Sequence, residues 1–154
     1  MKFLFQPAEE SAVGALKILQ TDVMQDVDRA WGFHVSSMSD TGVLGISAGY
    51  VAAAVDKFLV TITGTGSPAV KNDADMAALA AGVGEAAGYD VVPEGKVMSG
   101  DDFSFYQNNC PCCYIRIGTG RGPAIHQPGV QVDPDALLPT VRYLAELMME
   151  SAVS

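Results

Sequence analysis

Apolar and polar residues alternate in short blocks along the chain, and the spacing within each block predicts a strand or a helix. Short runs rich in β-branched and aromatic residues, bounded by glycine, proline or acidic residues, are typical of strands. The pattern predicts strands over residues 2–6, 30–35, 42–49, 52–63, 91–92, 97–98 and 112–117.

Three other blocks repeat apolar residues every three or four positions, which predicts helices with one apolar face. The first helix follows Pro7 and two acids, the second begins at the cap Asn72–Asp73 and stops at Gly88, and the third opens at Asp133. Pro139 lies inside the third block and predicts a kink or a restart there. A helical turn is expected over residues 101–106. The predicted apolar faces consist of Ala12, Ala15, Leu16, Leu19 and Val23, of Met76, Leu79, Ala80, Val83 and Ala87, and of Leu137, Val141, Leu144 and Met148.

Strands that alternate with helices predict an α/β fold, a layered sheet flanked by helices, with functional residues in loops at the strand ends. The 154 residues fit one domain that is long enough to bury a core. Residues 64–68 have the composition of a short linker.

Composition and charge exclude several classes of protein. Hydrophobic residues make up 49% and charged residues 18%, which is unlike a disordered chain. The formal net charge of −9 repels phosphate groups, so neither nucleic acid nor an anionic membrane surface is an expected partner. No uninterrupted run of about 18 apolar residues occurs, so no transmembrane helix is expected.

Three cysteines, Cys110, Cys112 and Cys113, lie within four residues of one another. An odd number at this spacing cannot form a disulfide framework, which favours a reducing, cytoplasmic location. A thiolate metal cluster is the alternative, but it lacks a second cysteine pair or a flanking histidine. Buried, reduced thiols are the favoured interpretation.

Few residues are candidates for catalysis or metal binding. His34 and His126 are the two histidines, each at a strand end or in a loop, and a single histidine is weak evidence for a ligand. The pair Glu9–Glu10 at a strand-to-helix junction can bind a cation and reach a bound water, or it can merely favour a helix N-terminus. Asp101 and Asp102 have capping as their default role. No nucleophile elbow, phosphate loop or dinucleotide fingerprint is present.

Six segments occur in the order of one known family: FLFQPAEE at 3–10, GFHV at 32–35, GYVAAAVDKF at 49–58, PAVKND at 68–73, SGDDFSFY at 99–106 and AIHQPG at 124–129. Together they resemble the aminoacylase and carboxypeptidase superfamily of two-metal hydrolases, in its hippurate hydrolase and indole-acetyl-amino-acid hydrolase branch. The resemblance implies the C-terminal portion of a zinc-peptidase catalytic domain. It also implies hydrolysis of the amide bond of a small N-acyl amino acid or short peptide.

The resemblance also assigns roles to single residues. Glu9 matches the general base, Glu10 and His126 match the ligands of one ion, and His34 matches a ligand of the other. The implied cofactor is a pair of divalent ions, zinc or manganese, with nickel or cobalt as alternatives. Asp101 stands where the family usually has glutamate, and this change leaves its role open.

Two parts of the family pattern are missing from this sequence. A Cys-Gly-His-Asp segment would supply further ligands, and residues 64–68 stand where the family inserts a lid domain. We therefore expect residues 1–154 to form a single partial catalytic domain with partial or no metal occupancy and low activity. The alternative is a non-catalytic fragment or interaction module that assembles with another chain. Missing strands would leave an exposed edge or apolar face, which predicts a homo-oligomer.

Overall fold

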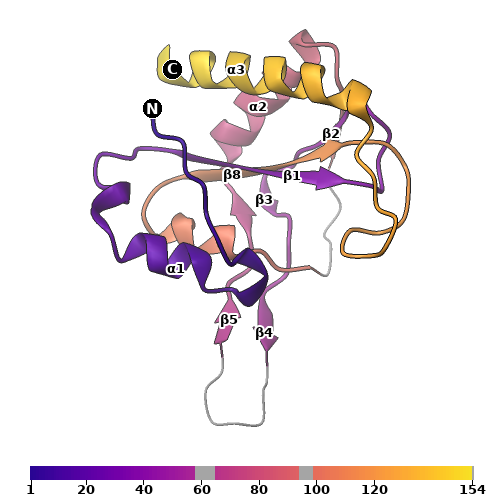
Figure 1. The fold of residues 1–154 in the computed structure, drawn as a ribbon. Coiled ribbons are helices and arrows are strands. Elements are labelled where there is room, and N and C mark those ends of the chain that lie inside the picture. The colour runs from indigo at the N-terminus through magenta and orange to yellow at the C-terminus, as the bar shows by residue number, and fades with distance from the viewer. Residues whose placement is uncertain (58–64, 94–98, 154) are drawn as a thin grey trace.

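A central mixed sheet organises the molecule (Figure 1). The computed structural model describes residues 1–57, 65–93 and 99–153. Within these residues the sheet has the strand order β1-β8-β2-β7. Strand β8 is parallel to β1 and antiparallel to β2, and β7 is parallel to β2. The strands are β1 (Ala30–Ser36), β2 (Val43–Gly45), β7 (Asp90–Val92) and β8 (Cys112–Gly118).

Helices cover both faces of this sheet, so the predicted layered α/β fold is confirmed (Figure 1). The helices α2 and α3 lie on one face, and α1 and the 3-10 helix η3 lie on the other. The bounds are α1 (Gly14–Leu19), α2 (Ala74–Ala86), α3 (Leu137–Val153), η1 (Glu9–Ser11), η2 (Asp22–Met24), η3 (Asp102–Asn108) and η4 (Pro134–Ala136).

Two short antiparallel pairs complete the described strands. One pair joins β3 (Gly49–Tyr50) to β6 (Lys71–Asn72), and the other joins β4 (Val55–Lys57) to β5 (Thr65–Ser67). The β4–β5 pair extends away from the central sheet (Figure 1). The segment 64–68 thus contains β5, while Gly64 lies outside the described residues. That this segment replaces a lid domain stays a prediction.

Alternation along β8 divides the core into two parts. Cys113, Ile115 and Ile117 pack with the helices α2 and α3, whereas Cys112 and Tyr114 pack on the side of α1 and η3. Successive side chains of a strand point to opposite faces, so one apolar strand supplies both cores. Strand β8 is therefore buried along its whole length except at one partly exposed position.

The predicted ends of α2 are confirmed. The Asp73 carboxylate accepts hydrogen bonds from the backbone amides of Asp75 and Met76, both at 3.1 Å, which satisfies donors that the first turn leaves unpaired. Gly88 has a φ of 87°, the left-handed conformation that ends a helix. Gly84 lets α2 approach the sheet, because a Cβ there would lie 2.7 Å from the Leu44 Cδ1.

Two predictions for the N-terminal region are wrong. Residues 2–6 form no strand, and Phe3 and Phe5 are 73% and 92% exposed. A strand needs a hydrogen-bonded neighbour, and no described strand pairs with this segment. The first helix is also shorter than predicted: α1 ends at Leu19, because the Thr21 hydroxyl donates to the Ile18 carbonyl at 2.7 Å and then caps η2.

The other strand predictions differ mainly in their boundaries. The strand at 30–35 is β1 and that at 112–117 is β8, each one residue longer at its C-terminal end. The strand at 42–49 shortens to β2, and within 52–63 the described strand is β4. The remaining residues 58–63, and the predicted strand at 97–98, lie outside the described residues. The turn at 101–106 corresponds to η3.

The predicted apolar face of α3 is partly wrong. Leu137 and Val141 are exposed, and the fully buried residues of this helix are Tyr143 and Leu147. The Tyr143 hydroxyl donates to the Ala80 carbonyl at 3.1 Å, so an aromatic ring with a polar end is accommodated between α2 and α3. Leu144 and Met148 are partly buried, as predicted.

Pro139 causes no break inside α3, because it lies in the first turn, where a backbone N–H has no helical partner to lose. The α-helix begins at Leu137, directly after the 3-10 helix η4, and continues through Pro139, so the restart predicted at Pro139 does not occur.

Two leucines of α3, one buried and one exposed, test which face of this helix packs against the core. Leu147→Ala should lower the free energy of unfolding by about 2–5 kcal/mol, because this side chain is fully buried. Leu138→Ala removes the same atoms from a side chain that is 60% exposed, and it should cost less than about 0.5 kcal/mol. Urea denaturation followed by circular dichroism measures both values. Equal losses for the two variants would contradict the packing described above.

Candidate active site

The two adjacent glutamates lie in a short, unusual turn. Glu9 and Glu10 belong to η1, and the flanking Ala8 and Ala12 have φ values of 59° and 52°. This left-handed conformation is uncommon for residues other than glycine and costs free energy at each position. Local sequence preference therefore does not favour the turn, and contacts with the rest of the molecule must hold it.

Glu9 and Glu10 face an open pocket of about 340 Å³. Its lining comes from the turn η1, the end of β5, the start of η3 and the glycine-rich loop after β8. The lining residues are Glu9, Glu10, Ala12, Ser67, Gly100, Asp101, Asp102 and His126. A larger hollow of about 560 Å³ lies elsewhere, at Tyr50, Lys71 and Gln107, and contains none of the predicted site residues.

Glu10 and His126 come from opposite ends of the sequence and meet in this pocket. The His126 Nδ1 lies 3.2 Å from the Glu10 Oε1, and both side chains are exposed. An exposed polar contact of this kind contributes little to stability. The pair is instead a carboxylate and an imidazole placed together with their polar atoms open to the pocket, which is a donor set that zinc and manganese accept.

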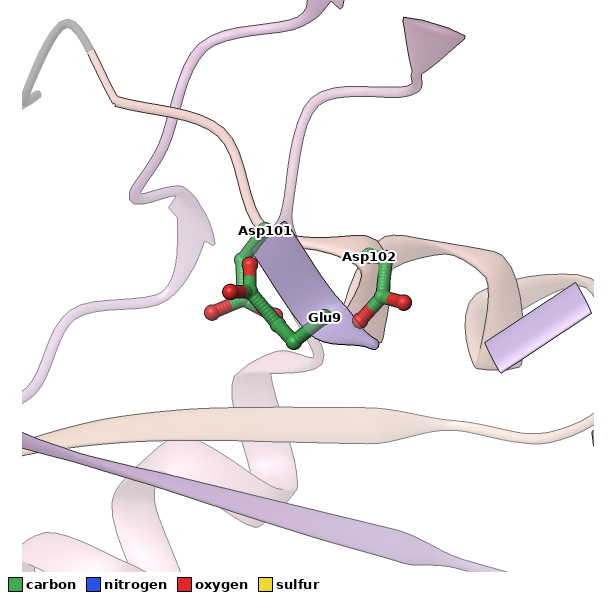
Figure 2. A group of neighbouring side chains, drawn as sticks. All are labelled: Glu9, Asp101 and Asp102. Carbon is green, nitrogen blue, oxygen red and sulfur yellow. The ribbon is translucent and has the colours of Figure 1, made fainter. Parts of the chain in front are cut away.

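Three carboxylates gather beside this pair. One oxygen from each of Glu9, Asp101 and Asp102 lies within 4.8 Å of the others (Figure 2). Glu9 comes from η1, and the two aspartates come from the start of η3.

Asp101 uses both of its oxygens in hydrogen bonds within the protein. One oxygen accepts from the Phe103 amide at 2.8 Å, and the other accepts from the Tyr114 hydroxyl at 2.6 Å. The predicted capping role of Asp101 is therefore confirmed. Burial, followed by the neighbouring Asp101 carboxylate, raises the pKa of Tyr114, so this phenol stays protonated as a donor.

Asp102 is only 1% exposed and is also fully engaged. The Gln6 Nε2 donates to one oxygen at 2.6 Å, and the Ala15 amide donates to the other at 3.0 Å. The sequence predicted a capping role for this residue and missed these distant partners.

Glu9 is the remaining member of the carboxylate group. No hydrogen bond to its carboxylate occurs among the described residues. Partial burial raises its pKa most, the nearby charges of Asp101, Asp102 and Glu10 add to the rise, and His126 opposes it. A raised pKa makes a carboxylate a better proton acceptor, which suits a general base.

His34 lies near this group but does not line the pocket. It stands in β1, with its ring centroid 6.1 Å from that of Tyr114, whose hydroxyl binds Asp101. The His34 Nδ1 lies 2.6 Å from the Val35 carbonyl oxygen, which can only accept, so the proton is on Nδ1. The lone pair of Nε2 is then free for a cation. The structure thus brings Glu9, Glu10 and His126 to one pocket, whereas His34 lies beside Tyr114 and outside the pocket lining.

The cysteines do not form a metal site in the described structure. All three are free and buried, as predicted. Cys113 lies in the core beneath α2 and α3, whereas Cys110 and Cys112 lie in the core on the opposite side of β8. Burial raises the pKa of Cys113 to about 12, so the thiolate that metals bind is disfavoured.

Comparison with known proteins identifies the family. The family described as Peptidase family M20/M25/M40 matches residues 1–150, nearly the whole chain. The chain belongs to this family. The resemblance based on the six sequence segments is thereby confirmed.

Several relatives of this M20 chain share part of its sequence. The N-acetylcysteine deacetylase of Bacillus subtilis is 39% identical over 69 residues, which cover 45% of this chain and 18% of the relative. An uncharacterized hydrolase, y4tI, of Sinorhizobium fredii is 33% identical over 135 residues, covering 82% of this chain and 33% of the relative. The Arabidopsis thaliana IAA-amino acid hydrolase ILR1-like 5 is 39% identical over 66 residues, which cover 43% of this chain and 15% of the relative. The chain thus spans at most about a third of these relatives.

Solved structures support the fold of the M20 chain. The Bacillus subtilis YXEP protein, described as a dinuclear metal binding peptidase from the M20 family, has a TM-score of 0.81 at 20% identity. The match covers 93% of this chain and 62% of that protein. A putative aminohydrolase from methicillin resistant Staphylococcus aureus has a TM-score of 0.74 at 15% identity. This match covers 94% of this chain and 65% of that protein. In the described part of the chain, no helix has the length and apolarity needed to cross a membrane.

Proposed function

We propose that this M20 chain forms part of the active site of a metal-dependent hydrolase that cleaves the amide bond of N-acyl amino acids. The observation that carries the proposal is the 3.2 Å approach of the His126 Nδ1 to the Glu10 Oε1 in the pocket that Glu9 also lines. The names of two relatives, an N-acetylcysteine deacetylase and an IAA-amino acid hydrolase, support the substrate class.

Glu10 and His126 would hold one divalent ion, zinc or manganese, and His34 would contribute to a second. Carboxylate and imidazole donors fit these metals, although nickel and cobalt also accept them. When bound, such an ion supplies Lewis acidity toward the oxygen of an amide carbonyl.

Glu9 would be the general base of the reaction. Its carboxylate faces the pocket and has no protein donor in the described structure, and its pKa is raised. It would take a proton from the attacking water and deliver that proton to the nitrogen of the leaving amino acid.

A second candidate is a non-catalytic fragment or module that assembles with another chain. The exposed aromatic side chains Phe3 and Phe5 favour it, because large apolar groups at a surface often mark an interface. A cytoplasmic location is compatible with either function, since three reduced, buried thiols fit a reducing compartment.

The chain alone should release amino acid from hippurate, in the presence of zinc or manganese, orders of magnitude more slowly than a full-length relative. Three protein ligands are few for two ions, and an open pocket orients the substrate poorly. Glu9→Gln should lower the residual kcat/KM by at least about 100-fold, since it removes the base.

Glu146→Gln on the outer side of α3 is the matched control and should leave the rate unchanged. Turnover that Glu9→Gln does not change would contradict the role of Glu9. Turnover equal to that of a full-length relative would contradict the expected low activity.

We also propose that the chain forms a homodimer through its exposed apolar surface. Strand β1 is at one end of the strand order, and Met1, Phe3, Val35 and Met38 are exposed. No described strand pairs with the outer edge of β1, and an unpaired edge together with exposed apolar side chains favours pairing with a second copy. Sedimentation equilibrium at tens of micromolar should therefore give the mass of a dimer, and Phe3→Ser combined with Phe5→Ser should weaken it. A monomer at this concentration would contradict the proposal.

A further inference from the structure

We infer that Asp102 is a positioning residue that holds the turn carrying Glu9 and Glu10 in place opposite His126. The inference rests on the proposed function, because it concerns the same site. It adds a residue that the six-segment resemblance leaves without a role.

Asp102 binds the chain on both sides of the turn. Gln6, whose side chain donates to one oxygen, precedes the two glutamates, and Ala15, whose amide donates to the other oxygen, follows them. One buried carboxylate thus connects the two ends of a short loop. The loop is also closed tightly between these points, because a Cβ on Gly14 would lie 1.9 Å from the Pro7 carbonyl oxygen.

The direction of the Gln6 amide is fixed by a further contact. The Tyr106 hydroxyl donates to the Gln6 Oε1 at 2.7 Å, so the Gln6 NH2 group must face Asp102. Burial, followed by the nearby Asp102 charge, raises the pKa of Tyr106 to about 12, which keeps this hydroxyl a donor at neutral pH. Tyr106, Gln6 and Asp102 therefore form a chain of hydrogen bonds with one consistent polarity.

The turn needs such an anchor because its own backbone is unfavourable. Ala8 and Ala12, on either side of η1, both have left-handed φ values. Strained conformations persist only where surrounding contacts determine them. Without the two hydrogen bonds to Asp102, the turn would relax and Glu10 would move relative to His126.

The polarity of the contact provides a sharp test. Asp102→Asn replaces one acceptor oxygen by an NH2 group. Either this group faces a donor, the Gln6 NH2 or the Ala15 N–H, or the Gln6 amide turns over and the Tyr106 hydroxyl loses its acceptor, so at least one hydrogen bond of the chain is lost. Adding Gln6→Glu restores an acceptor opposite the new NH2 group and keeps an oxygen for Tyr106. The double variant has the same net charge as the original chain, and all three hydrogen bonds can form again.

Two measurements on the intact chain are needed, one without metal and one with zinc alone. In the metal-free chain, Asp102→Asn should shift the backbone amide resonances of Glu9–Ser11, and the double variant should restore them. By equilibrium dialysis, Asp102→Asn should raise the zinc dissociation constant about tenfold or more, and the double variant should return it to within about threefold.

Leu147→Ala is the control for general destabilisation, because Leu147 lies in the other core, beneath α2 and α3. It should change neither the amide resonances of Glu9–Ser11 nor the zinc affinity. The inference is overturned if Asp102→Asn leaves these resonances unchanged, or if the folded double variant does not restore them. If the resonances respond but no variant, nor the original chain, binds zinc, the positioning role stands and the proposed function fails.

Discussion

The buried carboxylate of Asp102 is the constraint on which the site depends. A charged group that is 1% exposed is stable only when its oxygens are hydrogen-bonded, and here both partners come from the N-terminal segment, through Gln6 and Ala15. The bonds join segments that are far apart in the sequence. They fix the start of η3 against the turn η1, and so they determine where Glu9 and Glu10 lie.

The sheet provides the rigid support for this contact. Strand β8 is buried on both faces, and its residue Tyr114 binds the neighbouring Asp101. Asp101 and Asp102 are thereby held from two directions, one from the sheet and one from the N-terminal segment. Glu9 is left with a raised pKa among carboxylates that are already hydrogen-bonded, which is the kind of environment expected for a proton acceptor.

Much of the fold could be predicted because its signals are local. The cap at Asp73, the stop at Gly88 and the strand β8 each depend on neighbouring residues. The apolar face of α3 was only partly predictable, since Val141 has suitable helical spacing, but the packing of Tyr143 against α2 decides which side is buried. Apolar periodicity does not show which face meets the sheet.

Only part of the candidate site could be predicted from the sequence. Glu9, Glu10 and His126 were found through a family resemblance, and the structure brings them to one pocket. The prediction of a strand at residues 2–6 is wrong. A strand needs a hydrogen-bonded neighbour, and the alternation of residues in the sequence does not show whether one is present. The role of Asp102 was missed because its partner Gln6 is remote in sequence, and nothing local to a pair of aspartates distinguishes a helix cap from a long-range anchor.

Anomalous X-ray diffraction from crystals of the chain grown with zinc tests the central claim most directly. If the anchored turn presents Glu10 to His126 as a metal site, an anomalous peak should lie between these two side chains, with zinc-to-ligand distances of roughly 2.0–2.2 Å. An anomalous zinc peak elsewhere in the molecule, with no peak at Glu10 and His126, would contradict the account.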